Sequence, residues 1–311
     1  MTTIRFLPDQ KSAPVVSGCS ILNSALAAGI PLTHACGGEA KCSTCRVLVL
    51  EGQESCNPPN PAEFALAQKL GFDHEVRLAC QMRPTGPVTV RRLVLDETDT
   101  VLATGPLHAG RPEAVGEEKS MAVLFSDIRG FTRMSQQLLP YDIVHALNRH
   151  FEKMGDIILQ YGGTINNVMG DGIMALFEDR PGAAHPALRA TRAAMEINTG
   201  VELCGKPYFA RAYGADLAIG VGIHYGPVIA GQIGHSESRR LTVIGETVNF
   251  ASRIESANKQ TGTTLLVSEN VRGACGSLFQ WREFHNITLQ GMDKPVTLHE
   301  PLVPPGTAES A

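Results

Sequence analysis

The sequence has no marked excess of either charge, since its 311 residues include 27 lysines and arginines and 31 aspartates and glutamates. Proteins that neutralise nucleic-acid phosphates are usually strongly basic, so we expect no nucleic-acid binding. The first residues lack the basic and apolar segments of a signal peptide. The longest uncharged stretch, residues 217–234, is rich in glycine and contains a proline, which favours a strand hairpin over a membrane helix. We therefore expect a cytoplasmic protein without a membrane span.

Structural disulfides are also not expected, because disulfides are rare in cytosolic proteins. The sequence nevertheless contains eight cysteines, six of them within the first 80 residues. They are Cys19, Cys36, Cys42, Cys45, Cys56, Cys80, Cys204 and Cys275. In such a chain, clustered cysteines indicate metal ligands, whereas scattered ones are usually small core residues. The chemistry of the N-terminal part therefore differs from that of the rest.

The length favours two domains, and a hydrophobic content of 43% is ordinary for a folded protein. The composition changes in residues 94–116, which are first acidic and then rich in glycine and proline. We therefore predict an N-terminal domain over residues 1–93, a linker over 94–116, a second domain over 117–302 and a disordered tail over 303–311.

Apolar periodicity predicts an α+β fold class. In the N-terminal domain we expect strands over 3–7, 46–50 and 88–90 and helices over 21–28 and 61–70. In the second domain we expect strands over 121–126, 164–168, 173–177, 217–224, 228–233 and 242–244 and helices over 141–161, 183–202 and 247–259. The run Met121–Ser126 is continuously apolar, as in a strand buried on both faces. Gly226 and Pro227 predict a turn between two strands.

Four cysteines have the spacing of ligands. Cys36, Cys42 and Cys45 follow the pattern Cys-x5-Cys-x2-Cys, and 34 residues separate Cys45 from Cys80. Three thiolates on one loop and a distant fourth can enclose two irons and two sulfides, and loop glycines allow backbone amides to approach the sulfurs. Zinc is the alternative, although structural zinc sites usually have two short cysteine pairs. Cys19 and Cys56 lack partners at ligand spacing.

The words Cys36-Gly37-Gly38, Cys42-Ser43-Thr44-Cys45 and Leu78-Ala79-Cys80-Gln81 resemble those of [2Fe–2S] ferredoxins with adrenodoxin-like spacing. The resemblance covers roughly the whole N-terminal domain. It implies a β-grasp fold and a [2Fe–2S] cluster bound by the four cysteines.

Two carboxylates in the second domain suggest a metal site. Asp127 ends a buried strand and is followed by Gly130 and a helix start, so that backbone amides of residues 128–132 are available to a polyphosphate. Asp171 lies at a hairpin tip. Each residue alone is also explained as a helix cap or a turn residue. At neighbouring strand ends they suggest a two-metal site.

Asn249 and Arg253 are four residues apart and share one helix face. An amide and a guanidinium there can orient a ribose and stabilise charge on a reacting phosphate. A solvated helix face is the alternative explanation.

These words in order resemble the catalytic domain of class III nucleotidyl cyclases. The matching words are Phe125-Ser126-Asp127-Ile128-Arg129-Gly130-Phe131-Thr132, Met169-Gly170-Asp171, residues 226–234 and Val248-Asn249-Phe250-Ala251-Ser252-Arg253. The resemblance implies a ferredoxin-like βαββαβ core and a head-to-tail homodimer with two active sites at its interface. It further implies that Asp127, Asp171 and the Ile128 carbonyl of one subunit bind two Mg²⁺ or Mn²⁺ ions. Asn249 and Arg253 come from the other subunit.

The same resemblance places Gly130, Phe131 and Thr132 at the nucleotide and assigns purine recognition to Asn167 and Thr242. Adenylate-selective members have a lysine at the position of Asn167, and guanylate-selective members usually have a glutamate. Asparagine can donate and accept hydrogen bonds, so it could bind either purine. Threonine at the position of Thr242 also occurs in adenylate-type members, and we expect ATP as the substrate with GTP as the alternative.

A phosphate-binding lysine of the family is missing at Gln290-Gly291, where Lys294 is a candidate substitute.

The sequence thus predicts a soluble homodimeric adenylate cyclase, a lyase, whose activity depends on the redox state of its cluster and on a redox partner that the sequence does not name. The alternatives are a guanylate cyclase, a cyclase of relaxed specificity, and an electron-transfer ferredoxin that uses a weakly active cyclase domain for dimerisation and nucleotide binding.

Overall fold

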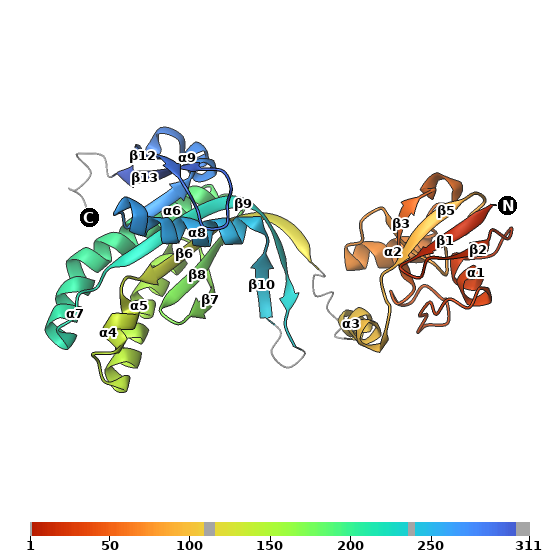
Figure 1. The fold of residues 1–311 in the computed structure, drawn as a ribbon, viewed down its shortest axis with the longest axis horizontal. Coiled ribbons are helices and arrows are strands. Elements are labelled where there is room, and N and C mark those ends of the chain that lie inside the picture. The colour runs from red at the N-terminus through yellow and green to blue at the C-terminus, as the bar shows by residue number, and fades with distance from the viewer. Residues whose placement is uncertain (1, 109–115, 236–239, 303–311) are drawn as a thin grey trace. The chain divides into compact units, whose positions relative to one another are not determined.

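The computed structural model describes residues 2–108, 116–235 and 240–302 and divides the chain into two units, Met1–Glu117 and Glu118–Ala311 (Figure 1). Both units combine helices with mixed sheets, so the predicted α+β class is confirmed. The predicted disordered tail lies outside the described residues.

The first unit contains a five-stranded sheet with the order β2-β1-β5-β3-β4. Its elements are β1 (Thr3–Leu7), β2 (Lys11–Pro14), α1 (Ile21–Ala27), β3 (Arg46–Glu51), η1 (Gln53–Ser55), α2 (Pro61–Leu70), β4 (Val76–Leu78), β5 (Val88–Arg92) and α3 (Glu97–His108). β1 and β5 are parallel, and the other pairs are antiparallel. Alternate residues of the strands, such as Ile4, Phe6, Val47 and Val49, are buried together with α1 and α2, which explains the period-two pattern of the sequence.

Helix α3 lies within residues 94–116, the segment that was predicted as a linker, and was not itself predicted. Asp96 accepts a hydrogen bond from the Asp99 amide at the start of this helix (2.8 Å). Ala103 is buried, and its carbonyl accepts a hydrogen bond from the Ser43 hydroxyl (3.1 Å). The helix therefore packs on the cysteine loop of its own unit. The breaker residues in this segment concealed the helix from analysis of the sequence.

The second unit contains an eight-stranded sheet with the order β12-β13-β11-β9-β6-β8-β7, and β10 also pairs with β9. Its first elements are β6 (Glu117–Ile128), α4 (Phe131–Ser135), α5 (Pro140–Gln160), β7 (Thr164–Met169), β8 (Gly172–Glu178), α6 (Pro186–Gly200), the π-helical η2 (Val201–Gly205) and α7 (Lys206–Tyr213). The remaining elements are β9 (Ile219–Ile233), β10 (Arg240–Ile244), α8 (Glu246–Thr261), β11 (Leu265–Ser268), α9 (Glu269–Cys275), η3 (Gly276–Leu278), β12 (Gln280–Ile287) and β13 (Val296–Leu302).

Strand β6 is buried on both faces, as its continuous apolar run predicts. Ala122 and Leu124 belong to the core beneath α5 and α6, whereas Met121 and Val123 belong to a second core that includes Ala251 of α8. Helices thus cover both faces of the sheet around this strand, which holds the end of β6 in place (Figure 1).

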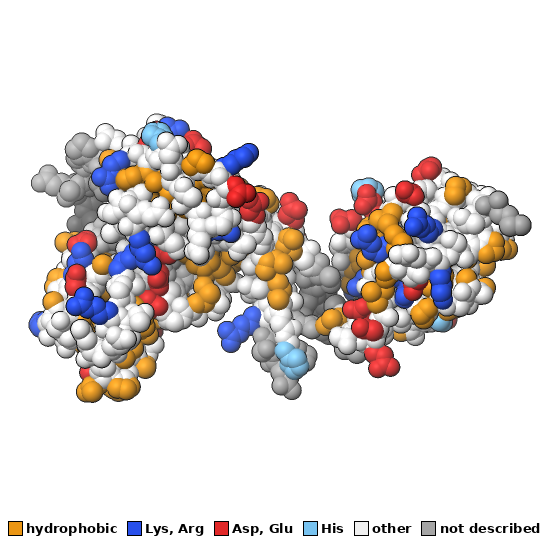
Figure 2. Space-filling model, in the orientation of Figure 1, with side chains coloured by type: hydrophobic (Ala, Val, Ile, Leu, Met, Phe, Trp, Pro, Cys, Tyr) orange, Lys and Arg blue, Asp and Glu red, His pale blue; other side chains and the backbone are white. Residues whose placement is uncertain are grey.

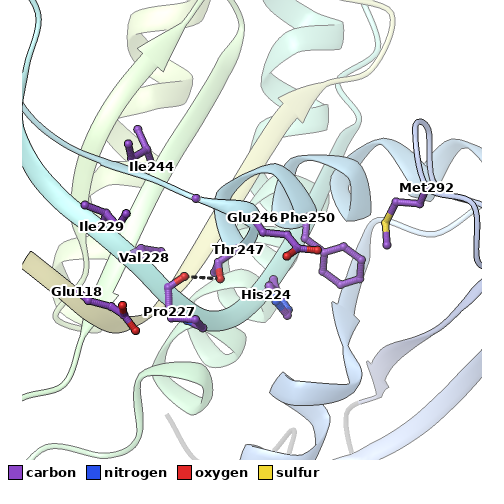
Figure 3. Close-up of a pocket in the computed structure, with 11 residues that line it drawn as sticks. Glu118, His224, Pro227, Val228, Ile229, Ile244, Glu246, Thr247, Phe250 and Met292 are labelled. Atoms are coloured by element: carbon purple, nitrogen blue, oxygen red, sulfur yellow. Dashed lines mark hydrogen bonds between the residues drawn. The ribbon is translucent and has the colours of Figure 1, made fainter. Parts of the chain in front are cut away.

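The predicted hairpin at Gly226-Pro227 is wrong, because β9 runs unbroken through both residues. Along its length β9 pairs with β11 over Val221–Ile223 and with β10 over Ile229–Ile233. Pro227 falls between these two partners, where its missing amide costs no ladder bond to either of them. Instead, its carbonyl accepts a hydrogen bond from the Thr247 hydroxyl at the start of α8 (2.7 Å; Figure 3).

The close approach of α8 to β9 depends on Gly222. A Cβ atom at this position would lie 2.1 Å from the backbone nitrogen of Glu255. We expect Gly222→Ala to lower the free energy of unfolding of the second unit by about 1–3 kcal/mol, because rigid backbone must shift. Gly273 of α9 has open space around its added Cβ. Gly273→Ala is expected to stabilise the unit by about 0.4–1 kcal/mol. Chemical denaturation of both variants tests the opposite signs, and equal midpoints would contradict them.

Among the described residues, no helix is both long enough and apolar enough to cross a bilayer.

Candidate active site and cysteine loop

The four predicted cluster cysteines lie on two segments of the first unit. Cys36, Cys42 and Cys45 belong to the loop before β3, and Cys80 follows β4. Gly38 has a φ of 91°, and a Cβ atom there would lie 3.6 Å from that of Cys80. Glycine adopts this left-handed conformation without strain. The loop therefore closes against the segment that carries the fourth cysteine.

The four thiols form two hydrogen-bonded pairs. Burial opposes ionisation of Cys36, but hydrogen bonds from Cys42 and from backbone amides of the loop outweigh burial and lower the pKa of Cys36. A hydrogen bond from Cys45 lowers the pKa of Cys80 to about 6, and the same bond together with burial raises the pKa of Cys45. One thiol of each pair is thus favoured as the thiolate, which is the form that binds metal.

Two thiol pairs are a suitable donor set for a [2Fe–2S] cluster, which takes four cysteine thiolates on two irons. Within residues 2–108, 116–235 and 240–302, no three His, Cys, Asp or Glu side chains are arranged to hold a single metal ion.

Gln81 is a neighbour of the cysteines that sequence analysis missed. Its side-chain amide donates to the Cys80 sulfur (3.2 Å) and to the Gly38 carbonyl (2.8 Å). Donors of this kind stabilise negative charge on ligand sulfurs. In contrast, the Cys56 thiol bonds to the Gly52 carbonyl (3.6 Å), and burial raises its pKa.

Asp127 and Asp171 meet at the end of β6, where the metal site was predicted. Asp171 lies in the tight turn between β7 and β8, after Gly170 with a φ of 64°. The two carboxyl groups are close enough for their charges to interact. Burial and the adjacent Asp127 raise the pKa of Asp171 to about 6.

This carboxyl pair fits divalent cations. Two adjacent carboxylates repel each other when both are ionised, so one of them retains a proton more strongly. A cation removes this repulsion, and carboxylate and carbonyl oxygens are the ligands that Mg²⁺ and Mn²⁺ prefer. A Cβ atom at Gly172 would lie 3.6 Å from Oδ1 of Asp127, so this glycine keeps the space beside the pair open.

The segment predicted to bind phosphate, residues 130–132, comes shortly after Asp127 in the sequence. Gly130 precedes α4 in a left-handed conformation, with a φ of 69°, and no side chain caps the helix. Phe131 is half-buried, and Thr132 is exposed. The first amides of a helix have no partner within the helix, and here they lie a few residues beyond Asp127.

Arg129 links β6, the strand that carries Asp127, to α8. No pattern in the sequence indicated this contact. Its Nη2 atom lies 2.8 Å from Oε1 of Glu255 and donates to the Glu255 carbonyl (3.0 Å). A Cβ atom at Gly220 would lie 1.6 Å from the same nitrogen. Only glycine leaves room there for the guanidinium. The two charged partners are 126 residues apart in the sequence, so local spacing could not predict the pair.

Asn249 and Arg253 are not brought to the carboxyl pair of their own chain. Each residue of a helix advances by about 100°, so Arg253 lies about 160° around α8 from Glu255, and Asn249 about 120°. The face of α8 that meets Arg129 is therefore not the face that carries the two predicted catalytic residues. Arg253 instead lies against the loop at Gly291, where an added Cβ would be 3.4 Å from its Nη2.

Lys294, the candidate phosphate ligand, is exposed three residues beyond Gly291.

Strand β7 has a bulge next to Asn167, one of the two residues predicted to bind the purine. Asn166 is left without a cross-strand partner where the register of β7 and β8 shifts between Ile165 and Asn167. Its side chain accepts a hydrogen bond from the Thr242 hydroxyl (3.0 Å) and donates to the Leu241 carbonyl (3.2 Å). Thr242 thus meets Asn166, which sequence analysis missed, whereas Asn167 is exposed.

A cavity of 490 Å³ adjoins the first turn of α8 (Figure 3). His224, Phe250 and Met292 line it together with residues of β9 and β10, and it includes neither Asp127 nor Asp171. It is therefore separate from the carboxyl pair.

Comparison with known proteins decides the family. Residues 114–299 match the adenylate and guanylate cyclase catalytic domain, which is more than half of the chain. The chain belongs to this cyclase family. Residues 5–85 match the 2Fe-2S iron-sulfur cluster binding domain. The predicted fusion of a ferredoxin-type domain with a cyclase domain is therefore confirmed.

Two curated relatives are adenylate cyclases. The protein from Anabaena cylindrica is 36% identical over 188 residues, covering 58% of this chain and 36% of the relative. Adenylate cyclase 1 of Rhizobium meliloti is 28% identical over 200 residues, covering 62% and 29%. The chain thus spans about a third of the length of these relatives.

Solved cyclase structures share the fold of the second unit. The adenylyl cyclase CyaB from P. aeruginosa is 29% identical with a TM-score of 0.55, covering 60% of this chain and 96% of that one. The guanylyl cyclase Cya2 is 31% identical with a TM-score of 0.54, covering 62% and 97%. The similarity extends to both adenylyl and guanylyl cyclases, so it does not decide between ATP and GTP as the substrate.

Proposed function

We propose that this protein is an adenylate cyclase that converts ATP to 3′,5′-cyclic AMP and pyrophosphate, and that its [2Fe–2S] domain regulates this activity. The observation that carries the proposal is the adjacent pair of Asp127 and Asp171 carboxyl groups at adjoining strand ends, where burial and the charge of Asp127 raise the pKa of Asp171. Two adjacent carboxylates repel each other unless a cation lies beside them, and two-metal sites that act on phosphates use such carboxylates.

Each residue has a definite role in this reaction. Asp127, Asp171 and the Ile128 carbonyl hold two Mg²⁺ or Mn²⁺ ions. When bound, these ions make the ribose 3′-hydroxyl more acidic and neutralise charge on the triphosphate. The amides of the segment Gly130–Thr132 orient the phosphates.

Asn249 orients the ribose, and Arg253 stabilises charge on the α-phosphate. The 3′-oxygen forms a bond to the α-phosphorus in line as the bond to the β-phosphate oxygen breaks. Pyrophosphate then leaves.

A homodimer completes the site, because α8 of the same chain presents Asn249 and Arg253 on a face that does not meet the carboxyl pair. Exposed apolar side chains on β7 and on the β9–β10 arms support an interface there (Figure 2). They are Val168, Met169, Ile229, Ile233, Leu241 and Ile244. Side chains of this kind are commonly covered by a partner.

Substrate choice is tested by direct competition. Purified protein supplied with equal ATP and GTP, and with Mg²⁺ or Mn²⁺, is expected to form mainly cyclic AMP. Support for ATP comes from the two adenylate cyclase relatives and from CyaB. Cyclic GMP is the second candidate, favoured by the similarity to Cya2. If cyclic GMP is the main product, the substrate is GTP. If neither cyclic nucleotide forms, the proposal of cyclase activity is contradicted.

The cysteine loop has a defined connection to the segment that leads into the cyclase domain. Ser43 lies between the ligands Cys42 and Cys45, is buried, and donates to Ala103 of α3 (3.1 Å). Arg46 donates to the Ser43 hydroxyl in turn (3.3 Å). A change of cluster charge acts first on this loop, so the hydrogen bond to α3 is the contact through which we expect it to travel.

We expect oxidation or reduction of the cluster to change kcat/KM by roughly 5–150-fold, the usual size of an allosteric coupling. Ser43→Ala is expected to bring this ratio close to one, because it leaves the Ala103 carbonyl without its donor. Ser12→Ala, at an exposed position of β2, is the matched control. Cyclase kinetics at controlled cluster potential, with the visible spectrum recorded in parallel, provide the measurement. An unchanged ratio in a Ser43→Ala protein with an intact cluster would exclude this route.

A further inference from the structure

A second cavity, of 360 Å³, lies between α5 and the segment α6–η2–α7. It is built only from the second unit and contains none of the residues assigned to nucleotide or metal. Its volume is within the range of about 300–1,000 Å³ that is usual for small-molecule sites. Its inner wall is apolar and comes from Met154, Ile157, Ile197, Val201, Phe209 and Leu217.

One side of the cavity carries three nitrogen groups from α5. Arg149, His150 and Lys153 all line it and lie within about one turn of each other on the same helix. Arg149 stacks over the Tyr208 ring at 3.8 Å but makes no carboxylate contact within the described part of the chain. Lys153 is highly exposed and has only a long contact to Asp156 (3.9 Å).

His150 is the polar group that needs a partner. It is only 6% exposed, and its ring nitrogens make no hydrogen bond to any described residue. Burial lowers its pKa to about 4, so the ring is neutral and has one N–H donor. The ring nitrogens are not among the fully enclosed polar atoms that lack a partner, so the imidazole is open to the cavity that it lines, where a ligand or water can bond to it.

The backbone around the cavity is also irregular. Residues Val201–Gly205 form a π-helical turn between α6 and α7, and such turns frequently occur at functional sites. Gly200, Cys204 and Gly205 contribute to the lining. The absence of side chains at the two glycines keeps the space between the helices open.

We propose that this cavity binds a small amphipathic carboxylate, with its alkyl chain against the apolar wall and its carboxylate at Arg149, Lys153 and the imidazole N–H of His150. A guanidinium offers the paired donors that a carboxylate prefers. The ammonium group adds a second positive charge at the opening. A neutral apolar ligand would not use the two exposed positive charges at the opening, and a highly charged one would not enter the apolar interior.

Titration calorimetry of the full-length protein with decanoate tests the proposal without depending on cyclase activity. We expect saturable binding of one decanoate per chain, and binding at least about tenfold weaker for 1-decanol, which has the same chain length but no charge. Arg149→Gln combined with Lys153→Gln is expected to remove that preference. Arg211→Gln, on α7 but outside the cavity lining, controls for the loss of a positive charge near the cavity and should bind decanoate normally.

Gly200→Leu separates occupation of the cavity from surface adsorption. A Cβ atom at Gly200 would meet only Ile157, at 4.0 Å, so the larger side chain has room to extend across the cavity. This variant is expected to bind neither ligand while its thermal unfolding stays cooperative. Should it misfold, protection of Cys204 from a maleimide by decanoate in the unmodified protein gives an independent readout.

The proposal is overturned if decanoate and decanol bind equally, if the double variant binds like the parent, or if decanoate fails to protect Cys204. Binding that disappears as protein concentration rises would instead show that a second copy of the chain covers the cavity, and this also overturns the proposal.

Discussion

Replacing Asp127 or Asp171 by alanine is expected to reduce cyclic nucleotide formation to background, because either change removes half of the charge that holds the cations. The same substitutions are expected to leave the unfolding temperature unchanged or to raise it. Each substitution relieves the unfavourable contact that burial and the neighbouring carboxyl group impose on Asp171. Loss of activity with an unchanged or higher unfolding temperature would separate a catalytic role from a structural one. Activity within a few-fold of the parent would contradict the assignment.

Mixing experiments test whether each site is shared between two chains. Arg253→Ala is expected to lose about 10²–10³-fold in kcat, the usual cost of removing one preorganised donor. An equal mixture of Asp127→Ala and Arg253→Ala chains should recover about a quarter of the parent activity. Half of the dimers are then mixed, and each mixed dimer has one intact site of two.

The control for this experiment is a mixture of Asp127→Ala and Asp171→Ala chains. Both carboxylates come from one subunit in the proposed dimer, so every site in this mixture is defective and no activity should return. Recovery in both mixtures, or in neither despite proven subunit exchange, would rule out the shared site.

Replacing Cys80 by serine is expected to abolish cluster binding. The unmodified protein should be red-brown and contain about two irons and two sulfides per chain. Serine removes the thiol whose pKa is lowered to about 6 and replaces it with a hydroxyl that does not ionise near neutral pH. Iron and sulfide analysis after anaerobic, iron-replete expression is the measurement.

Cys56→Ser is the matched control, since Cys56 lies in the same unit and bonds only weakly to the Gly52 carbonyl. This variant should retain a full cluster. Zinc without iron in the unmodified protein would contradict the cluster assignment altogether, and equal losses in both variants would contradict the choice of ligands.

The sequence predicted those features that depend on local spacing or on a single element. The apolar run at Met121–Ser126 predicted a strand buried on both faces, and β6 has cores on both sides. The alternation around Ile4 and Phe6 predicted a sheet with one buried face. The two aspartates were predicted to meet because each follows a strand end, and they do.

Features that depend on distant residues escaped prediction. Gly226 and Pro227 predicted a turn, but the effect of a proline on a strand depends on which neighbouring strand needs its amide, and Pro227 lies outside the residues that pair with β10 and β11. The hydrogen bond between Asn166 and Thr242 was not predicted, because it depends on a register shift between β7 and β8 at Asn166 and on a residue 76 positions away. Helix α3 is stabilised by its contact with Ser43, which lies far away in sequence. Local propensity contains none of this information.

The ion pair between Arg129 and Glu255 has a consequence for the kinetics of the proposed dimer. Within one chain it joins the strand end that supplies carboxylates to one site to the helix that supplies Asn249 and Arg253 to the other. If occupation of the first site shifts the end of β6, we expect the ion pair to transmit that shift to α8. The two sites of the proposed dimer would then influence each other, and initial rates plotted against ATP concentration should depart from a hyperbola. Arg129→Ala should restore a hyperbolic dependence of the initial rate on ATP concentration, because it removes the ion pair that links the two sites.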